Sequence, residues 1–274
     1  YLGLSQNREI VYEMPPNRSL HSLTINNGGA TLSIPGGNLQ IDNSLYLTSG
    51  KIDMNGDTLT LGINIHYSGS LSSPNSDSYL FNCKFRRWIH GHDTIAPIIF
   101  PIGIAAGPRQ ANIHFTTPSS NSGTLTAEFI ESSSTSAGLP LNEGDLPVNS
   151  ISDAGYWRIN SGNGFTGGNY NAQFTATIPS AVADFSKTVL VKRLNGVSPW
   201  TLNGTQSATQ GNNTTLTLRR TSMTGFGEFG IGLPIVAGSP GSTWTGTIST
   251  AWEDAANWSN GVPGSSTAVT IPGG

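Results

Sequence analysis

The chain has 274 residues, of which 36% are hydrophobic and 11% are charged. This length and hydrophobic content allow one large or two ordinary domains, while the charged fraction is far below the usual figure of about a quarter, so we expect a surface of hydroxyl and amide groups. The net charge of −3 excludes the basic surface that a nucleic acid or an anionic membrane requires, and the absence of a long apolar run predicts no membrane span.

Residues 20–62 carry the clearest pattern in the chain, because apolar residues recur there in pairs at positions i and i+2. Side chains alternate between the two faces of a strand, so each pair lies on one face of a short strand. Leu32 to Ile52 and Leu39 to Leu59 span the same interval, whose length is typical of one repeat of a stacked solenoid, while Leu23 to Leu45 is slightly longer. Two coils are too few for a stable stack, so we predict a β-solenoid with covering strands over residues 1–100.

The segment from Tyr79 to Ile89 alternates for long enough to form one or two covering strands at the end of the solenoid. It contains the single cysteine, Cys83, which excludes an intramolecular disulfide. Residues 90–107 are rich in turn signals and include Pro97 and Pro101, so we expect the domain junction there.

Residues 108–233 carry longer strand-forming segments at wider spacing, and no convincing helix. About eight strands separated by turn signals predict an antiparallel β-sandwich of the immunoglobulin-like kind. Trp157 and Trp200 are the expected anchors of its core. The expected strands are 111–116, 123–130, 155–159, 170–178, 188–194, 200–202, 214–220 and 227–231.

The C-terminal region divides into a linker, residues 234–243, and a tail, residues 244–274. The tail ends in TAVTIPGG, which matches ATLSIPGG at residues 30–37. We therefore expect the tail to be the start of a following solenoid repeat or a strand that joins a neighbouring subunit, in a longer protein where the two kinds of unit alternate. The predicted fold class is all-β: a short, β-helix-like β-solenoid, then an antiparallel β-sandwich, then a C-terminal tail that begins another solenoid unit.

Four sequence features together resemble the large repetitive cell-surface and secreted proteins of Bacteroidota: the tail motif W-T-G…W…A-x-N-W…G-x-P…V-T-I-P, the coil segment L-T-S-G-x-I-D-M-N-G-D-T-L-T-L-G, Y-L-F-N-C-K-F-R-R followed by F-P-I-G, and G-F-G-E-F-G-I-G. The resemblance covers most of residues 20–274. It implies an extracellular protein of alternating β-solenoid and β-sandwich units, of the adhesin or surface-filament kind, exported by type IX secretion. It carries over no catalytic residue, because the matching motifs are turns and core strands.

The sequence favours a non-enzymatic role with no cofactor. Stacked coils and a sandwich would form a stiff extracellular rod, and exposed strand edges are templates for strand addition, so the expected partners are neighbouring repeats or copies of the same chain. The alternative is a glycan-binding module of a secreted polysaccharide-degrading protein, because a neutral, hydroxyl-rich surface suits a glycan.

Three tryptophans of the tail, Trp244, Trp252 and Trp258, are the candidates for glycan or inter-subunit contact. Trp88 and Trp200 could also stack on a sugar ring. The competing interpretation is that these side chains pack in a core or cap, which is the commoner role of tryptophan in short β proteins.

His90, His92 and Asp93 place two imidazoles and a carboxylate within four residues and are weak candidates for metal ligands. No distant His or Cys at ligand spacing completes the set, so a polar loop is the preferred interpretation and no metal is predicted. His66 and His114 could join them only through the fold.

Acidic residues of the solenoid allow an enzyme hypothesis, because parallel β-helix lyases hold Ca²⁺ with stacked carboxylates and use a basic residue to abstract a proton. The coils offer only Lys51 and Arg18 as bases, and Asp-Gly sequences are ordinary turns, so no catalytic residue is predicted. Glu128 and Glu131 are three apart in a strand-to-loop segment and would face opposite sides if the strand persisted, which does not suit a glycosidase pair. The aspartates concerned are Asp42, Asp53 and Asp57.

Thr58 and Thr94 are the candidate O-glycosylation sites. Each follows an aspartate and precedes an apolar residue, which resembles the sites where Bacteroidota attach O-glycans. An intact mass without added hexose would exclude both sites.

Overall fold

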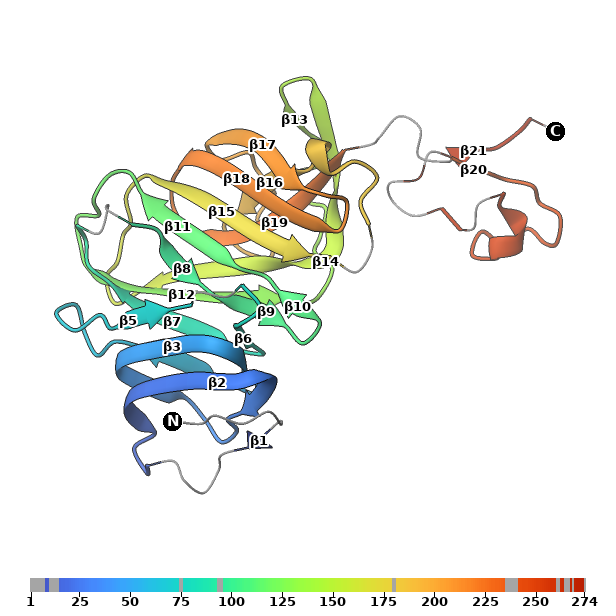
Figure 1. Cartoon of the computed structure of the whole chain (residues 1–274). Helices are drawn as coiled ribbons and strands as arrows, with labels where there is room; N and C mark the ends of the chain where they lie inside the picture. The colour runs from blue at the N-terminus through green and yellow to red at the C-terminus, as the bar shows by residue number, and fades with distance from the viewer. Residues whose placement is uncertain are drawn as a thin grey trace.

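The computed structural model describes residues 8–9, 15–73, 76–92, 96–178, 181–234, 241–259, 262–263, 267 and 269–273. It is 55% strand and 3% helix, with a β-solenoid of about 4 turns and a separate antiparallel sheet, which confirms the predicted fold class (Figure 1). The helical residues form two single turns, η1 (Phe185–Lys187) and η2 (Ala255–Asn257). Within the described ranges, no helix has the length and apolar character needed to cross a membrane.

The solenoid is built from strands that pair in parallel from coil to coil. The predicted register is confirmed, because Leu32 is the direct cross-strand partner of Ile52, and Leu39 is the partner of Leu59. Two of the strands are 15 residues long and bend around most of a coil (Figure 1). The solenoid strands are β1 (Arg8–Glu9), β2 (Ser19–Ser33), β3 (Leu39–Asp53), β4 (Thr58–Leu61), β5 (Ser70–Ser72), β6 (Leu80–Phe81) and β7 (Lys84–Ile89).

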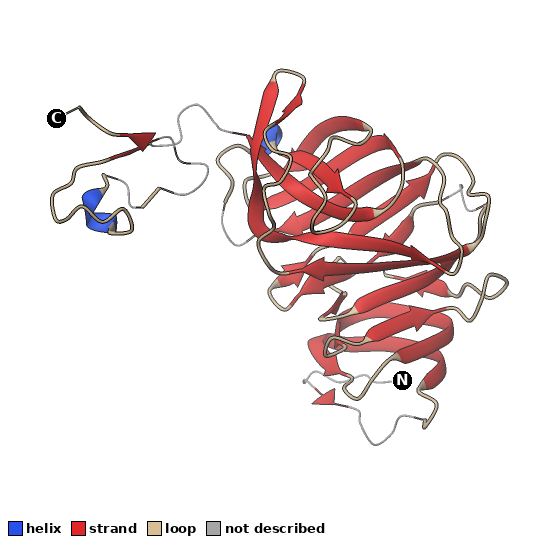
Figure 2. Cartoon of the chain, turned by 180° about the vertical axis from the view of Figure 1, so that it is seen from behind, coloured by secondary structure: helices blue, strands red, loops and turns tan. Residues whose placement is uncertain are grey.

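The sheet of the solenoid continues without a break into the sandwich. β7 pairs in parallel with β4 on one side and antiparallel with β12 (Gly123–Ile130) on the other. β7 is therefore both the last coil strand of this face and the first neighbour of the sandwich, rather than a separate cover. The path of this 14-stranded sheet is β10-β9-β6-β3-β4-β7-β12-β14-β19-β16, and seen from behind its strands stack in one continuous series (Figure 2).

Residues 90–107, the expected junction, are not a simple linker. β8 (Ile98–Phe100) lies in the five-stranded sheet beside β11 (Ala111–Phe115), whereas β9 (Ile102–Ile104) pairs in parallel with β6 of the solenoid. β10 (Gly107–Pro108) folds back onto β9. The segment thus supplies one strand to each unit, and the two units interleave along the chain instead of separating between residues 100 and 108.

The sandwich places β12, β14, β19 and β16 of the large sheet against a second sheet of order β17-β18-β15-β11-β8. Trp157 is buried between the layers against Phe129 and Phe174, with ring centroids 5.2 and 4.9 Å away, as expected of a core anchor. Trp200 is also buried, but in a separate small cluster with three valines, and its segment forms a single bridge rather than the expected strand. The remaining strands are β13 (Leu141–Glu143), β14 (Leu146–Gly162), β15 (Tyr170–Thr177), β16 (Val189–Arg193), β17 (Thr205–Gly211), β18 (Thr215–Met223) and β19 (Gly227–Pro234).

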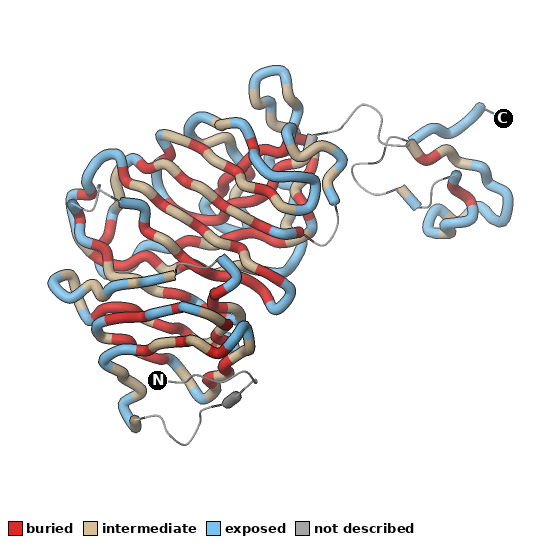
Figure 3. Tube along the Cα trace, in the orientation of Figure 1, coloured by how far each residue is buried: buried red, intermediate tan, exposed pale blue. Residues whose placement is uncertain are grey.

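One apolar core runs through both units, from Leu23 in the first described coil to Ile231 in the sandwich. Buried and exposed positions alternate along the strands, as Figure 3 shows, because one face of each strand points inward. After the sandwich, β20 (Ser242–Thr243) lies at the end of the expected linker and pairs in parallel with β21 (Val269–Thr270) of the tail, as successive coils of a solenoid do.

Candidate functional site

The three candidate tryptophans of the tail pack on one another. Trp258 is 4% exposed and lies edge-on against Trp244 and Trp252, at centroid distances of 4.9 and 4.5 Å. Its indole Nε1 donates a hydrogen bond of 2.8 Å to the carbonyl of Trp252. Only Trp252 is about half exposed, so the cluster is a small local core more than an open aromatic platform.

Asn257 holds the loop of the tail, a role that the sequence analysis missed. Its buried side-chain oxygen accepts hydrogen bonds of 3.0 Å from the backbone N–H groups of Ile248 and Ser249. Its Nδ2 donates to the Ser249 hydroxyl at 2.9 Å and to the Ala251 carbonyl at 3.0 Å. The Asn-Trp pair of the tail motif could have indicated this role. Its Asn is the polar centre of the loop, and its Trp is the apolar centre of the same loop.

The strand after this loop is exposed, although its sequence matches a buried part of the solenoid. Leu32 and Ile34 of ATLSIPGG are 4% and 0% exposed. The corresponding Val269 and Ile271 of TAVTIPGG are 41% and 62% exposed. β21 therefore has the apolar pattern of a coil strand, but no coil in the described part of the chain covers it as neighbouring coils cover the matching residues of the solenoid.

The opposite end of the solenoid has an open strand edge. β2 pairs along its length with β3, but on its other side the described residues provide only β1, at Leu32 and Ser33. The first part of β2, from Ser19 to Ile25, thus has one side without a neighbouring strand in the described part of the chain. Open edges of this kind accept a further strand through backbone hydrogen bonds.

A polar cleft of about 510 Å³ lies on the outer face of the shared sheet, across β7, β12 and β14. Lys84 and Arg86 come from β7, because they alternate with inward-facing Phe85. Arg86 is the cross-strand partner of Thr126, and its Nε donates to the Thr126 hydroxyl at 3.3 Å. The remaining lining residues are Thr124, Glu128, Arg158, Asn160, Ser161, Gly162 and Asn163.

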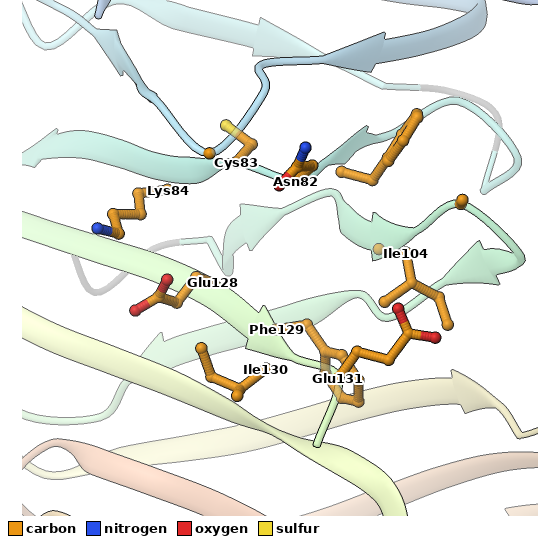
Figure 4. A pocket seen from close by; sticks show the side chains of 12 residues that line it. Asn82, Cys83, Lys84, Ile104, Glu128, Phe129, Ile130 and Glu131 are labelled. Atoms are coloured by element: carbon orange, nitrogen blue, oxygen red, sulfur yellow. The ribbon is translucent and has the colours of Figure 1, made fainter.

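A second hollow of about 430 Å³ adjoins the first, since Lys84 and Glu128 line both. β12 ends at Ile130, so the strand does not persist to Glu131 and the condition for opposite faces is not met. Glu131 lines the same hollow as Glu128. The two carboxylates nevertheless do not converge. Figure 4 shows Glu128 directed to the side of Lys84 and Glu131 directed to the side of Ile104.

Charged side chains alternate in sign across four strands beside the cleft. Glu128, Arg158, Glu228 and Arg193 are successive cross-strand partners. Arg158 contacts Glu128 at 3.2 Å and Glu228 at 2.8 Å, and Arg193 contacts Glu228 at 2.7 Å. Burial alone would lower the pKa of Arg158, but the hydrogen bond and negative charge of Glu228 raise it above its ordinary value. Arg158 is therefore positively charged and is paired with glutamates of the neighbouring strands of its own sheet.

The metal candidates do not form a complete site in the described residues. The rings of His90 and His92 lie 5.5 Å apart, and the backbone N–H of His92 donates to Nδ1 of His90. Asp93 lies outside the described residues. Within the described ranges, no group of three His, Cys, Asp or Glu side chains could hold a metal ion.

The solenoid aspartates have local structural roles. Asp57 accepts a hydrogen bond of 2.9 Å from the backbone of Gly37, and Asp53 accepts one of 2.8 Å from the backbone of Asn55. Asp42 accepts one from Ser19, and Arg18 donates to the carbonyls of residues 37 and 38. These contacts hold turns and neighbouring coils together.

Of the two glycosylation candidates, Thr58 is 9% exposed at the start of β4, which leaves its hydroxyl little room for a sugar in the folded chain. Thr94 lies outside the described residues.

No protein-family model, curated protein or solved structure matches the chain. Its function must therefore be inferred from the geometry.

Proposed function

We propose that this chain is a non-enzymatic structural or adhesive unit of an extracellular bacterial assembly, in which units associate end to end through their solenoid edges. The proposal includes the surface location and the type IX export that the sequence resemblance implies. Its main support is the contrast between two similar segments: Leu32 and Ile34 of ATLSIPGG are buried in the solenoid, while Val269 and Ile271 of TAVTIPGG are exposed.

The partner of the tail in this proposal is the β1–β2 end of the solenoid in a second copy of the unit. β20 and β21 pair in parallel, as β1 and β2 do, so among the described residues β21 has the strand direction needed to continue the parallel pairing at the β1–β2 end. Full burial of an aliphatic side chain contributes about 1.5–3 kcal/mol, so covering two such residues, with added backbone hydrogen bonds, supplies a substantial part of an association energy.

The experiment is removal of residues 244–274 from the chain. We expect the shortened chain to keep its solenoid and sandwich, because no described residue of the tail belongs to the shared core. Its multimer or filament formation, measured by light scattering and electron microscopy, should be lost. Unchanged assembly after the removal would contradict the proposal.

The glycan-binding alternative receives less support from the tail tryptophans, because their rings contact one another and Trp258 is buried. Substitution of the half-exposed Trp252 is the direct test. If Trp252→Ala abolished retention on an immobilised glycan without changing the melting temperature, the tail would be a sugar-binding site.

A further inference from the structure

We propose that the polar cleft on the outer face of the shared sheet binds an acidic glycan, a polysaccharide that carries carboxylate or sulfate groups. The binding groups are the cations of Lys84 and Arg86 with the amides and hydroxyls around them. This inference is independent of the end-to-end association, because the cleft lies on β7, β12 and β14 and its described lining contains no residue of the tail or of β2.

The charge of the cleft supports an anionic ligand. Lys84 is exposed, and neither Lys84 nor Arg86 forms an ion pair with a carboxylate in the described part of the chain. Glu128, the acidic residue of this cleft, pairs instead with Arg158 at 3.2 Å. The lining thus has two uncompensated cations, in a chain whose net charge is −3.

The sheet also determines where the two cations, Lys84 and Arg86, lie relative to each other. The hydrogen bond from Arg86 Nε to Thr126 fixes the guanidinium along the sheet and leaves its terminal nitrogens for a carboxylate or sulfate. Lys84 lies two residues away on the same face of β7, about 7 Å along the strand. Two cations at this spacing suit separate anionic groups along one polysaccharide better than they suit one isolated ion.

The neutral groups of the cleft suit sugar hydroxyls. Asn163 donates to the Thr124 hydroxyl at 3.2 Å, and the exposed Asn160 lies beside Thr126 as its cross-strand partner. Trp88 extends the same face of β7 beyond Arg86 and is only partly buried, so it offers a ring surface for stacking.

The shape of the cleft suits a polymer. Its hollow adjoins a second one at Lys84 and Glu128, along the region where the solenoid meets the sandwich, so a polymer can extend past the two cations. The second hollow also contains Glu131, so the anionic groups of the polymer belong over the first. Nucleic acid is the less favourable polyanion, because its binding requires many clustered cations, whereas the described lining of the cleft offers two uncompensated cations among neutral hydroxyl and amide groups.

The test is calorimetric titration of the full chain with polygalacturonate and with dextran sulfate. Uncharged dextran is the matched neutral polymer, and a single-stranded DNA oligonucleotide is the competing polyanion. We expect both acidic glycans to bind, binding to weaken with added salt, and dextran to bind at least about tenfold more weakly.

The double variant Lys84→Gln/Arg86→Gln should lose at least about tenfold in affinity for both acidic glycans. Lys187→Gln is the control that removes one positive charge from an exposed side chain far along the sequence, as Lys84→Gln does within the cleft, and it should bind like the unmodified chain. If the double variant melts at a lower temperature, Lys84→Gln alone is used, because this exposed side chain can be changed without altering the core. Equal affinity of variant and unmodified chain, equal binding of dextran, no binding of either acidic glycan, or tighter binding of DNA would overturn the proposal.

Discussion

Glu228 is the residue on which the charge row beside the cleft depends. Its side chain and that of Arg193 are each 2% exposed, and they lie 2.7 Å apart. The Arg193 guanidinium also lies over the ring of Trp200, 4.3 Å from its centroid, and donates to the Thr135 hydroxyl at 2.8 Å. The buried charge of Arg193 is thus balanced by one carboxylate, so loss of that carboxylate leaves an uncompensated buried cation.

Glu228→Gln should therefore lower the free energy of unfolding by about 3–5 kcal/mol, the usual cost of removing one partner of a buried ion pair. Denaturant unfolding measures this difference. Asp184→Asn is the control, since it removes the more exposed Asp184–Lys187 pair and should cost far less, because solvent screens an exposed ion pair. Similar small losses for both variants would show that Glu228 does not have this role.

Cys83 is expected to be chemically inert in the folded chain. Burial raises the pKa of its thiol from 9.0 to about 12. Between these values the folded chain keeps the proton that the unfolded chain loses. The contribution of Cys83 to stability is therefore complete below about pH 9 and falls above it, by at most about 1.4 kcal/mol per pH unit.

A thiol reagent should consequently label Cys83 at pH 8 only after denaturant is added. In Cys83→Ala, the decrease in unfolding free energy between pH 9 and pH 10 should be smaller than in the unmodified chain by about 1 kcal/mol. This interval avoids Tyr170, whose burial also raises its pKa and which affects stability only above its ordinary value of 10.0. Rapid labelling of the native chain would contradict the buried state of the thiol.

At the scale of an element, the first two coils differ in length and still stay in register. Leu23 pairs with Leu45 and Leu32 pairs with Ile52, although the first interval is the longer one. β3 has additional residues early in the coil, and the Asn-Asn-Gly-Gly segment of β2 restores the shorter interval later. The side chain of Asn27 from this segment lies against Gly50, which has a φ of +112°.

Gly50→Ala should destabilise the solenoid because an added Cβ would collide with Asn27 and lie 2.9 Å from the Ala30 carbonyl. Gly29→Ala is the matched control, with a φ of +90° but no atom within 4 Å of an added Cβ. Gly29→Ala should cost about 1–2 kcal/mol from backbone strain, and Gly50→Ala clearly more. Thermal melting of the two variants compares these costs, and equal melting temperatures would contradict the close packing.

The sequence predicts those elements whose pattern is local. The alternation of Leu, Ile and polar residues predicted the correct coil register, because a constant interval between apolar pairs specifies which strands are neighbours. β8 and β9 were missed as strands because each is three residues long and buried, without a polar alternation to mark it. The cleft could not be predicted either: alternation assigns Arg86, Thr126 and Asn160 each to a face of its strand, but only the strand order brings them together.

At the scale of the whole molecule, the solenoid and the sandwich share one sheet and one core. Relative motion of the two units would break the backbone pairing of β7 with β12 and expose apolar residues on both sides. This continuity favours a stiff unit, which is the property that an end-to-end assembly requires.

The most direct test of such an assembly is sedimentation of the full chain over a range of concentrations, with Val269→Asp/Ile271→Asp compared with Val197→Asp. Val197 is 89% exposed in a loop, so its substitution makes one apolar-to-Asp change of the same kind away from the tail strand. We expect the unmodified chain and Val197→Asp to gain mass with concentration, because β21 can be covered by the solenoid end of another copy, and the tail variant to remain at the mass of one chain. A tail variant that gains mass as the unmodified chain does would contradict the end-to-end association.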